Sequence, residues 1–311
     1  MVNKELLLSI CIPTYNGGAS FLDSVLRHTI SLAELYPDEV EVIVSDNSST
    51  DNTSDIISSL KKHSCLRTYR NETNVGFKGN LLLLTDKYSQ GKFSWIIGDD
   101  DFIMPSALPL IIEKLKEDCC DFISIGSEII HLPELNKTLN KTRTYTFIQG
   151  SYAHVIDQNC YEGNVLASFM GGAIFRTSKF REFPKNFITN SFNDFRNVFP
   201  NGYIYASVFY NSSCGCISQI SIISVSRDKS WSTSDNVYLI FSKYLPDLYK
   251  YIVNKGYKNS DLKKTYNVLL YKTTMITLIR IKQREQVKGL LELFVKLLCR
   301  PSVFFRVIKS L

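Results

Sequence analysis

The sequence predicts an α/β protein built on a doubly wound, mostly parallel sheet, with a mainly helical C-terminal extension. Short apolar runs alternate with helical patterns from residue 6 to about residue 125, and a polar loop follows each run. Such alternation is typical of parallel sheets covered by helices. After residue 130 it stops, and residues 236–311 carry Tyr, Leu, Ile and Lys at mixed helical spacing.

Strands are expected where apolar runs are short, and helices where apolar residues recur every three or four positions. The expected strands are 6–12, 40–44, 66–70, 93–97 and 121–125, and the expected helices are 20–35, 54–62, 80–88 and 105–116. A glycine turn at 171–172 leads into another strand that ends at residue 176, whereas the polar segment 131–170 carries no clear pattern. In open α/β sheets, ligands bind beside the carboxyl ends of the strands, so the loops there are the candidate site.

Three consecutive carboxylates, Asp99, Asp100 and Asp101, follow the apolar run 93–97 and Gly98. Like charges this close repel one another, and a hard divalent cation with oxygen ligands offsets the repulsion. The triplet therefore predicts a metal site that holds a phosphorylated ligand. A solvated acidic turn is the alternative interpretation.

Composition describes a globular, mildly basic chain. The 311 residues carry a formal net charge of +6, which suits anionic ligands but is too weak to indicate nucleic acid. The eight cysteines include no C-x-x-C pair, so reduced thiols and a cytosolic protein are expected. The N-terminus does not have the pattern of a signal peptide, and no apolar run is long enough to span a bilayer. The four histidines have no paired metal-ligand spacing and are expected at the surface or its boundary.

Four motifs occur in order at the ends of the expected strands: Ile-Pro-Thr-Tyr-Asn at 12–16, Ser-Asp-Asn-Ser-Ser-Thr-Asp at 45–51, Asn-Val-Gly at 74–76, and Gly-Asp-Asp-Asp at 98–101 with Pro105 beyond. Together they resemble the family 2 inverting glycosyltransferases, which have the A-type, nucleotide-binding fold. The Asn-Val-Gly-Phe and Gly-Asp-Asp-Asp segments are also similar to the abequosyltransferase-like branch, whose members build bacterial O-antigen and related surface polysaccharides.

The resemblance implies a nucleotide-sugar donor and a Mg²⁺ or Mn²⁺ ion that bridges its two phosphates. The metal ligands would be Asp100 and Asp101. The residues that would bind the nucleotide are Pro13, Thr14, Tyr15, Asn16, Asp46, Lys78, Asn80 and Asp99. Chemistry also leaves plainer roles open: Asp46 as a cap of the following turn, and Lys78 as a solvated lysine.

Inversion at the sugar carbon needs a base that takes the acceptor's proton. The family usually supplies it from a Glu-Asp or Asp pair well beyond the metal motif, and no Glu-Asp pair follows here. Asp194 is the nearest candidate, with Asp157 and Glu162 as weaker ones, and a cap or surface role for Asp194 is the alternative. The family's late Arg-x-His loop is replaced by Arg227-Asp228-Lys229, so Arg227 and Lys229 are expected to contact the diphosphate.

These expectations divide the chain into a catalytic domain, 1–235, and a helical region, 236–311. Residues 1–125 would form the nucleotide-sugar half of the domain and 126–235 the acceptor half. The expected reaction moves a hexosyl or deoxyhexosyl group to a hydroxyl of a lipid-linked or growing bacterial surface glycan. Apolar residues interleaved with Lys and Arg at 290–309 suit either an amphipathic helix pair on the inner face of the cell membrane or packing on the domain.

Two other classes remain open at this point. A nucleotidyltransferase shares the architecture and the acidic metal site, but it would need a basic, Gly-rich phosphate loop after the first strand, and residues 13–18 contain no basic residue. A non-catalytic nucleotide-sugar-binding protein that kept the fold is the second. The absence of a Gly-x-Gly-x-x-Gly fingerprint after the first strand argues against a dinucleotide oxidoreductase.

Overall fold

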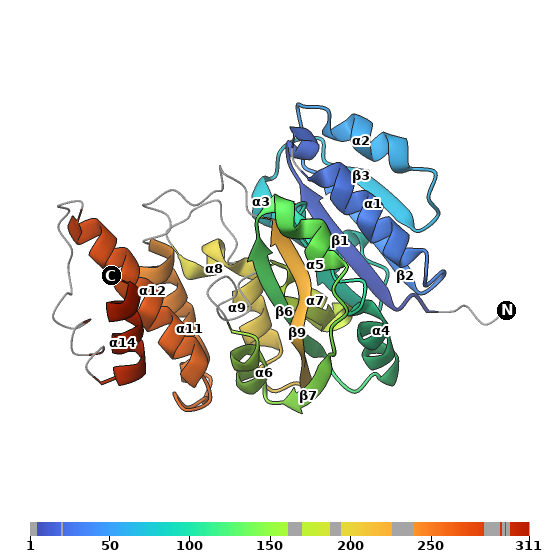
Figure 1. The fold of residues 1–311 in the computed structure, drawn as a ribbon. Helices are drawn as coiled ribbons and strands as arrows, with labels where there is room; N and C mark the ends of the chain where they lie inside the picture. Colours follow the sequence, from blue (N-terminus) through green and yellow to red (C-terminus); the bar gives the residue numbers. More distant parts are fainter. Residues whose placement is uncertain are drawn as a thin grey trace.

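A computed structural model of the chain describes residues 5–19, 21–160, 170–186, 194–225, 239–282, 293, 296 and 299–310. One nine-stranded sheet runs through this part, flanked by helices on both faces (Figure 1). The strands are β1 (Leu8–Thr14), β2 (Val40–Asp46), β3 (Leu66–Arg70), β4 (Phe93–Ile96), β5 (Asp101–Ile103), β6 (Phe122–Ile130), β7 (Thr146–Gly150), β8 (Ala173–Arg176) and β9 (Cys214–Val225). The predicted α/β class is confirmed.

The sheet has a parallel half and a mixed half. Its order is β3-β2-β1-β4-β8-β6-β9-β5, and β7 also pairs with β9. The first four strands are mutually parallel, as predicted. β8 lies between β4 and β6 and is antiparallel to both, and β5 is antiparallel to β9. Since β6 consequently runs in the same direction as β4, the carboxyl ends of β1, β2, β4, β6 and β9 share one edge.

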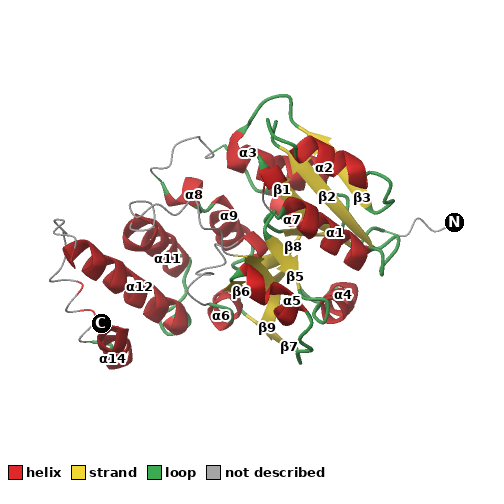
Figure 2. Cartoon of the chain, turned by 45° about the horizontal axis from the view of Figure 1, so that its top comes forward, coloured by secondary structure: helices red, strands yellow, loops and turns green. Residues whose placement is uncertain are grey.

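The helices follow the strands closely in the first half and dominate the end of the chain (Figure 2). They are α1 (Leu22–Ala33), α2 (Thr53–Leu60), α3 (Gly76–Leu83), α4 (Leu108–Glu117), α5 (Leu135–Leu139), α6 (Tyr152–Gln158), α7 (Thr177–Glu182), α8 (Phe195–Val198), α9 (Pro200–Val208), α11 (Leu245–Asn254), α12 (Lys263–Lys282) and α14 (Pro301–Ser310). A π-helical turn, Leu84–Tyr88, extends α3, and another, Ile240–Tyr244, precedes α11. The unassigned segment 131–170 contains α5, β7 and α6.

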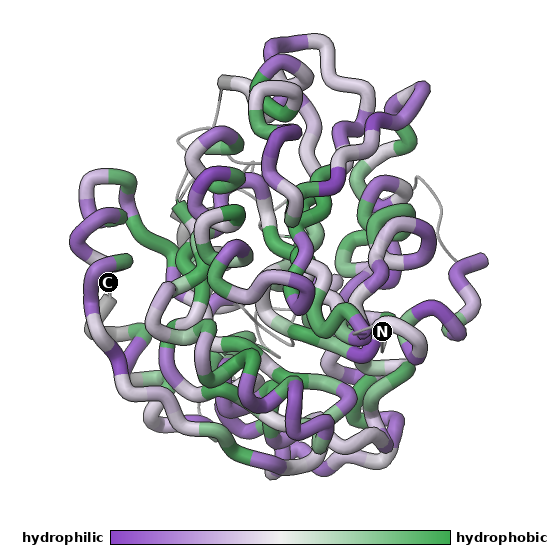
Figure 3. Tube along the Cα trace, turned by 90° about the vertical axis from the view of Figure 1, so that its right-hand side faces the viewer, coloured by the Kyte–Doolittle hydropathy of each residue, from purple (hydrophilic) through white to green (hydrophobic). Residues whose placement is uncertain are grey.

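Alternate residues of each central strand enter two separate cores. Ile10 and Ile12 of β1 belong to the core beneath α1 and α4, whereas Cys11 belongs to the core shared with α6, α9 and α11. Successive strand side chains point to opposite faces, so a strand that is apolar at consecutive positions is covered on both. Hydrophobic stretches accordingly gather toward the middle of the molecule (Figure 3).

The C-terminal helices pack on the rest of the chain and on each other. Leu248 and Ile252 of α11 are buried in the second core. Val303 and Val307 of α14 are buried against Leu270 of α12. This face of α14 thus packs within the helical region 236–311, and both the membrane-surface and the domain-packing interpretations of 290–309 stay predictions. Within the described ranges, no helix combines the length and the apolar content that crossing a bilayer requires.

Candidate active site

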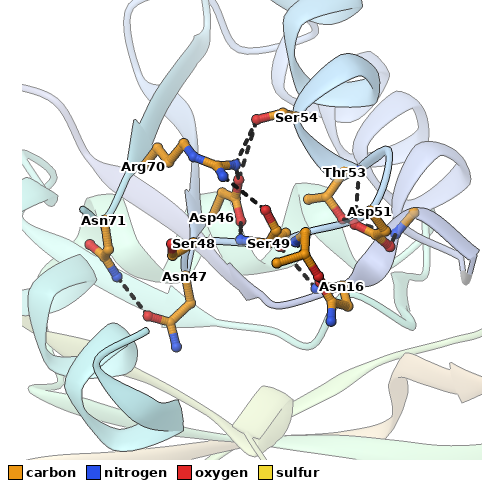
Figure 4. A network of polar contacts seen from close by, with 12 residues as sticks. Asn16, Asp46, Asn47, Ser48, Ser49, Asp51, Thr53, Ser54, Arg70 and Asn71 are labelled. Carbon is orange, nitrogen blue, oxygen red and sulfur yellow. Dashed lines mark hydrogen bonds and ion pairs between the residues drawn. The ribbon is translucent and has the colours of Figure 1, made fainter. Parts of the chain in front are cut away.

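Hydrogen bonds join the loop after β1 to the loop after β2 (Figure 4). Asn16, in the left-handed conformation with φ 52°, accepts a bond from the Thr50 amide at 2.9 Å and donates its own amide to the Ser49 hydroxyl at 2.9 Å. The Gly18 amide donates to Asp51 at 2.9 Å. Asn tolerates positive φ better than most residues, which explains its presence in this turn. The neighbouring Tyr15 is 49% exposed, so its ring is available to a ligand.

Asp46, at the end of β2, is buried with protein partners on both carboxylate oxygens. Oδ1 accepts a hydrogen bond from the Ser49 amide at 2.8 Å, and Oδ2 forms an ion pair with Arg70. The expected turn-capping role of Asp46 is therefore present. Arg70 was not among the expected site residues, although its place at the end of the adjacent strand, directly beside Asp46 in the β2–β3 register, was a usable signal.

A small cavity of about 140 Å³ lies beside this ion pair. It is lined by Asp46 and Arg70 together with Ser54, Ile57, Lys61 and Tyr69, among others. A cavity lined by a carboxylate, a guanidinium and hydroxyl groups offers polar contacts to a ligand.

Asn80 and Lys78, both from α3, are buried under the same loops. The Asn80 amide exchanges hydrogen bonds with Ser45, accepting from its hydroxyl at 2.6 Å and donating to its carbonyl at 2.9 Å. Lys78 is 5% exposed and donates to Asn197 of α8 at 3.4 Å, and burial lowers its pKa. The solvated alternative for Lys78 is thus wrong. The predicted contacts of both residues with ribose or diphosphate stay predictions.

Thr14 and Asp99 connect the end of β1 to the aspartate triplet. The Thr14 hydroxyl donates to Asp99 Oδ2 at 2.7 Å. Gly17 leaves room for this bond, because a Cβ there would lie 2.4 Å from Thr14 Oγ1 and 2.9 Å from Asp99 Oδ2. Two of the expected nucleotide-binding residues are therefore brought together at the carboxyl edge of the sheet.

The second and third aspartates converge around Gly98. A Cβ on Gly98 would lie 2.7 Å from Asp100 Oδ1 and 2.9 Å from Asp101 Oδ2, so only glycine allows both carboxylates there. Asp101 begins β5, a strand the sequence did not predict, and pairs with Ser224 of β9. Its Oδ2 accepts a bond from the Gly98 amide at 2.6 Å. Burial, and next the charge of Asp100, raises the pKa of Asp101 to about 8.

The chemistry of this cluster fits a divalent cation. The buried Oδ1 of Asp101 has no hydrogen-bond partner within the described part of the chain, so it is available as a metal ligand. The described residues contain no preassembled group of three or more His, Cys, Asp or Glu side chains that would hold a metal alone. Mg²⁺ in nucleotide sites is commonly bound by only one or two carboxylates, with substrate phosphates and water completing its shell. Asp100 and Asp101 meet that smaller requirement.

Asp194 caps the short helix α8. It accepts a bond from the Arg196 amide at 2.8 Å and forms an ion pair with the Arg196 guanidinium, which lowers the pKa of the carboxyl. The alternative role as a cap is therefore present, and a catalytic role for Asp194 stays a prediction. Asp157, the weaker candidate, accepts from the amides of Lys264 and Thr265 and so caps the first turn of α12. Glu162, Arg227 and Lys229 lie outside the described residues.

Comparison with known proteins matches this arrangement to one family. The family model described as glycosyl transferase family 2 matches residues 9–183, more than half of the chain. Abequosyltransferase RfbV of Salmonella typhimurium is 24% identical over 98% of this chain and 93% of its own length. The TarS poly(ribitol-phosphate) β-N-acetylglucosaminyltransferase of Staphylococcus aureus is 29% identical over 38% of this chain and 20% of its own length.

Two solved structures share the fold. The mannosyltransferase PcManGT of Pyrobaculum calidifontis, in complex with GDP-Man and Mn²⁺, superposes with a TM-score of 0.56 at 13% identity, covering 97% of this chain and 83% of its own. Residues 1–349 of S. aureus TarS, in complex with UDP-GlcNAc, superpose with a TM-score of 0.53 at 14% identity, covering 86% and 82%.

The fold and the site thus define an A-type glycosyltransferase, an enzyme that transfers a sugar from a nucleotide sugar. Within that class, the chain belongs to glycosyl transferase family 2. The nucleotidyltransferase alternative is set aside by this match.

Proposed function

We propose that this protein is an inverting, metal-assisted glycosyltransferase whose acceptor is a hydroxyl of a lipid-linked or growing bacterial surface glycan. The observation that carries the proposal is the meeting of the Thr14–Asp99 pair with Asp100 and Asp101 at the carboxyl edge of the sheet. The similarity to an abequosyltransferase over nearly the whole chain supports the acceptor class.

The proposed division of labour follows the geometry. Tyr15 and the interlocked loops after β1 and β2 would hold the nucleotide, with Asp99 fixed by Thr14 beside it. Asp100 and Asp101 would hold Mg²⁺ or Mn²⁺, which when bound neutralises charge developing on the leaving diphosphate. We also propose that residues 1–235 form the catalytic domain, as the sequence predicts.

We propose Asp194 as the base, on the condition that its ion pair with Arg196 opens when the acceptor binds. Its ion pair with Arg196 holds the carboxyl ionised, which suits acceptance of a proton, but a lowered pKa weakens it as a base near neutral pH. Binding of the acceptor would have to separate the pair. In an assay of transfer, Asp194→Asn is expected to lower kcat by 100-fold or more, as loss of a general base does. Unchanged transfer would move the base elsewhere.

The test of the function is a screen of nucleotide sugars by thermal shift, with Mn²⁺ and with EDTA, followed by a transfer assay. A ligand that binds only the folded protein raises its melting temperature. The expected result is a donor whose shift and turnover both depend on Mn²⁺ and are both lost in Asp100→Asn. A donor that binds and reacts equally well in EDTA would refute the metal assignment, and a donor that binds without any turnover would favour the non-catalytic alternative.

A further inference from the structure

A second, larger cavity lies between the sheet and the C-terminal helices, apart from the aspartate triplet. Its volume is about 630 Å³. One wall is the carboxyl half of β6 with the facing part of β9, and the other is formed by α12 and α14. We call this cavity the basic groove.

The described lining of the basic groove is more cationic than anionic. Among the described residues, three cationic side chains line it: Lys264 and Lys272 of α12 and Arg306 of α14. The single acidic residue in the described part of the lining is Glu128, which also contacts Arg143 at 3.5 Å. Lys264 and Lys272 are eight residues apart, about 12 Å along the helix axis. Arg306 lies over the ring of Tyr271 at 4.1 Å, which positions its guanidinium. Cations from two elements around one hollow predict an anionic ligand.

A backbone irregularity shapes the opposite wall. The register of β6 and β9 shifts on both sides of Gly126, with Ile125 paired to Ile217 but Gly126 paired to Ile220. Gln219 has φ 85°, and a Cβ on Gly126 would lie 2.1 Å from the Gln219 carbonyl oxygen. Bulges that bend a strand are frequent beside functional sites. Here the bulge lies in the cavity wall itself.

The same strand connects the basic groove to the aspartate triplet. Ile220 of β9 lines the groove, and Ser224 of β9 pairs with Asp101. Four residues of extended strand span about 13 Å. A ligand in the groove is therefore near enough for one elongated acceptor molecule to reach the sugar-transfer site.

We infer that the basic groove binds the phosphate or diphosphate group of the acceptor. The acceptor identity rests on the proposed function, whereas binding of a diphosphate can be measured without it. Lys272 and Arg306 would contact the phosphate oxygens, and Glu128 would limit affinity for anions. The groove would then select phosphate-bearing acceptors and leave donor binding to the aspartate edge.

The test uses the full chain in EDTA, so that no metal bound at Asp100 and Asp101 contributes. Calorimetric titration with farnesyl diphosphate is expected to show binding that weakens with salt. The double variant Lys272→Gln, Arg306→Gln is expected to weaken it tenfold or more. The matched control, Lys116→Gln with Lys250→Gln, removes two positive charges from other helices and is expected to bind as the native chain does. Equal binding by both double variants would overturn the inference.

Further ligands separate the possible sources of phosphate. Inorganic pyrophosphate is expected to compete with farnesyl diphosphate, and farnesol is expected not to bind. Binding only to phosphatidylglycerol vesicles, with none to the soluble diphosphates, would overturn the inference in favour of a membrane-surface role. Should the double variant fail to fold, Glu128→Gln serves instead, because removal of the acidic lining residue is expected to tighten diphosphate binding. Diphosphate binding without any sugar transfer would count against the proposed function and against the acceptor identity, and it would leave the assignment of the groove as a diphosphate site intact.

Discussion

The hydroxyl of Thr14 ties the end of β1 to the first residue of the aspartate triplet. Thr14→Val removes the hydroxyl and keeps the shape of the side chain. Loss of this bond is expected to lower the free energy of unfolding by about 0.5–1.5 kcal/mol and to raise the KM for the donor. Urea unfolding and donor titration check both effects.

The matched control is Thr274→Val. Thr274 is also buried, and its hydroxyl bonds the Leu270 carbonyl within α12, away from the aspartates. A similar rise in donor KM in both variants would show that the Thr14 hydroxyl has no local role at the donor site.

His28 is expected to make the stability of the protein depend on pH. Its Nε2 lies 2.7 Å from the Ile103 carbonyl of β5, and burial lowers its pKa below the usual 6.5. The unfolded chain therefore binds a proton here more readily than the folded chain, so stability falls as pH drops below about 6.5 toward the lower folded pKa. His28→Gln is expected to lose this part of the slope. Urea unfolding of both proteins at pH 7.5 and 5.5 gives the comparison, and identical slopes would contradict the assignment.

At the scale of elements, α12 begins with a cap supplied by α6. Asp157 accepts hydrogen bonds from the amides of Lys264 and Thr265, at 3.2 and 2.7 Å. Asp157→Ala is expected to lower the free energy of unfolding by about 0.5–2 kcal/mol, the usual cost of a lost cap, and to leave kcat per folded molecule unchanged. A large loss of kcat with full stability would instead support the weaker prediction that Asp157 is the base.

The elements that sequence patterns predicted are those whose signals are local. The apolar run of β1 is buried on both faces, and β3 has the predicted bounds, 66–70. β5 was missed because it is three residues long and is defined by pairing with β9, more than a hundred residues away. The position of β8 between β4 and β6 also depends on strand pairing, which a local sequence pattern cannot predict.

The same distinction applies to the candidate site. Thr14, Asp46 and the aspartates could be predicted because the ends of parallel strands share an edge. The capping role of Asp157 could not, since its partners lie over a hundred residues away. Nor could the basic groove, because its charges come from α12 and α14 and its other wall from β6 and β9.

At the scale of the whole molecule, the sheet edge opposite the aspartates is held by ion pairs. Arg176, at the end of β8, pairs with Asp118 at 2.5 Å and with Asp121 at 2.6 Å, and Lys179 pairs with Asp121 at 2.6 Å. Arg176 lies beside Phe93, the first residue of β4, so the network is at the far end of the strands from the triplet. It joins β8 and α7 to the segment between α4 and β6.

Asp121→Asn tests the network. Two charged hydrogen bonds weaken, and because their cationic partners are partly exposed, the expected loss is about 1–2 kcal/mol of unfolding free energy. Added salt is expected to shrink the difference between variant and native protein. Turnover per folded molecule is expected to stay unchanged, as urea unfolding and a transfer assay would show. A loss of turnover larger than the loss of folded protein would mean that the two edges are coupled.

At the aspartate edge, removal of a carboxylate charge is expected to raise the stability of the protein, whereas at the opposite edge it is expected to lower it. Asp100, Asp101 and Asp99 place like charges together, and the charge of Asp100 adds to the raised pKa of Asp101. Asp100→Asn removes one charge from this cluster, so unfolding in EDTA is expected to require about 0.5–2 kcal/mol more free energy than in the native chain, the range typical of stabilising substitutions. Metal-dependent turnover is expected to be lost in the same variant. If the variant is less stable than the native chain in EDTA, Asp100 stabilises the loop after β4. Repulsion between the carboxylates, which a cation is proposed to offset, would then not be the dominant force at this edge.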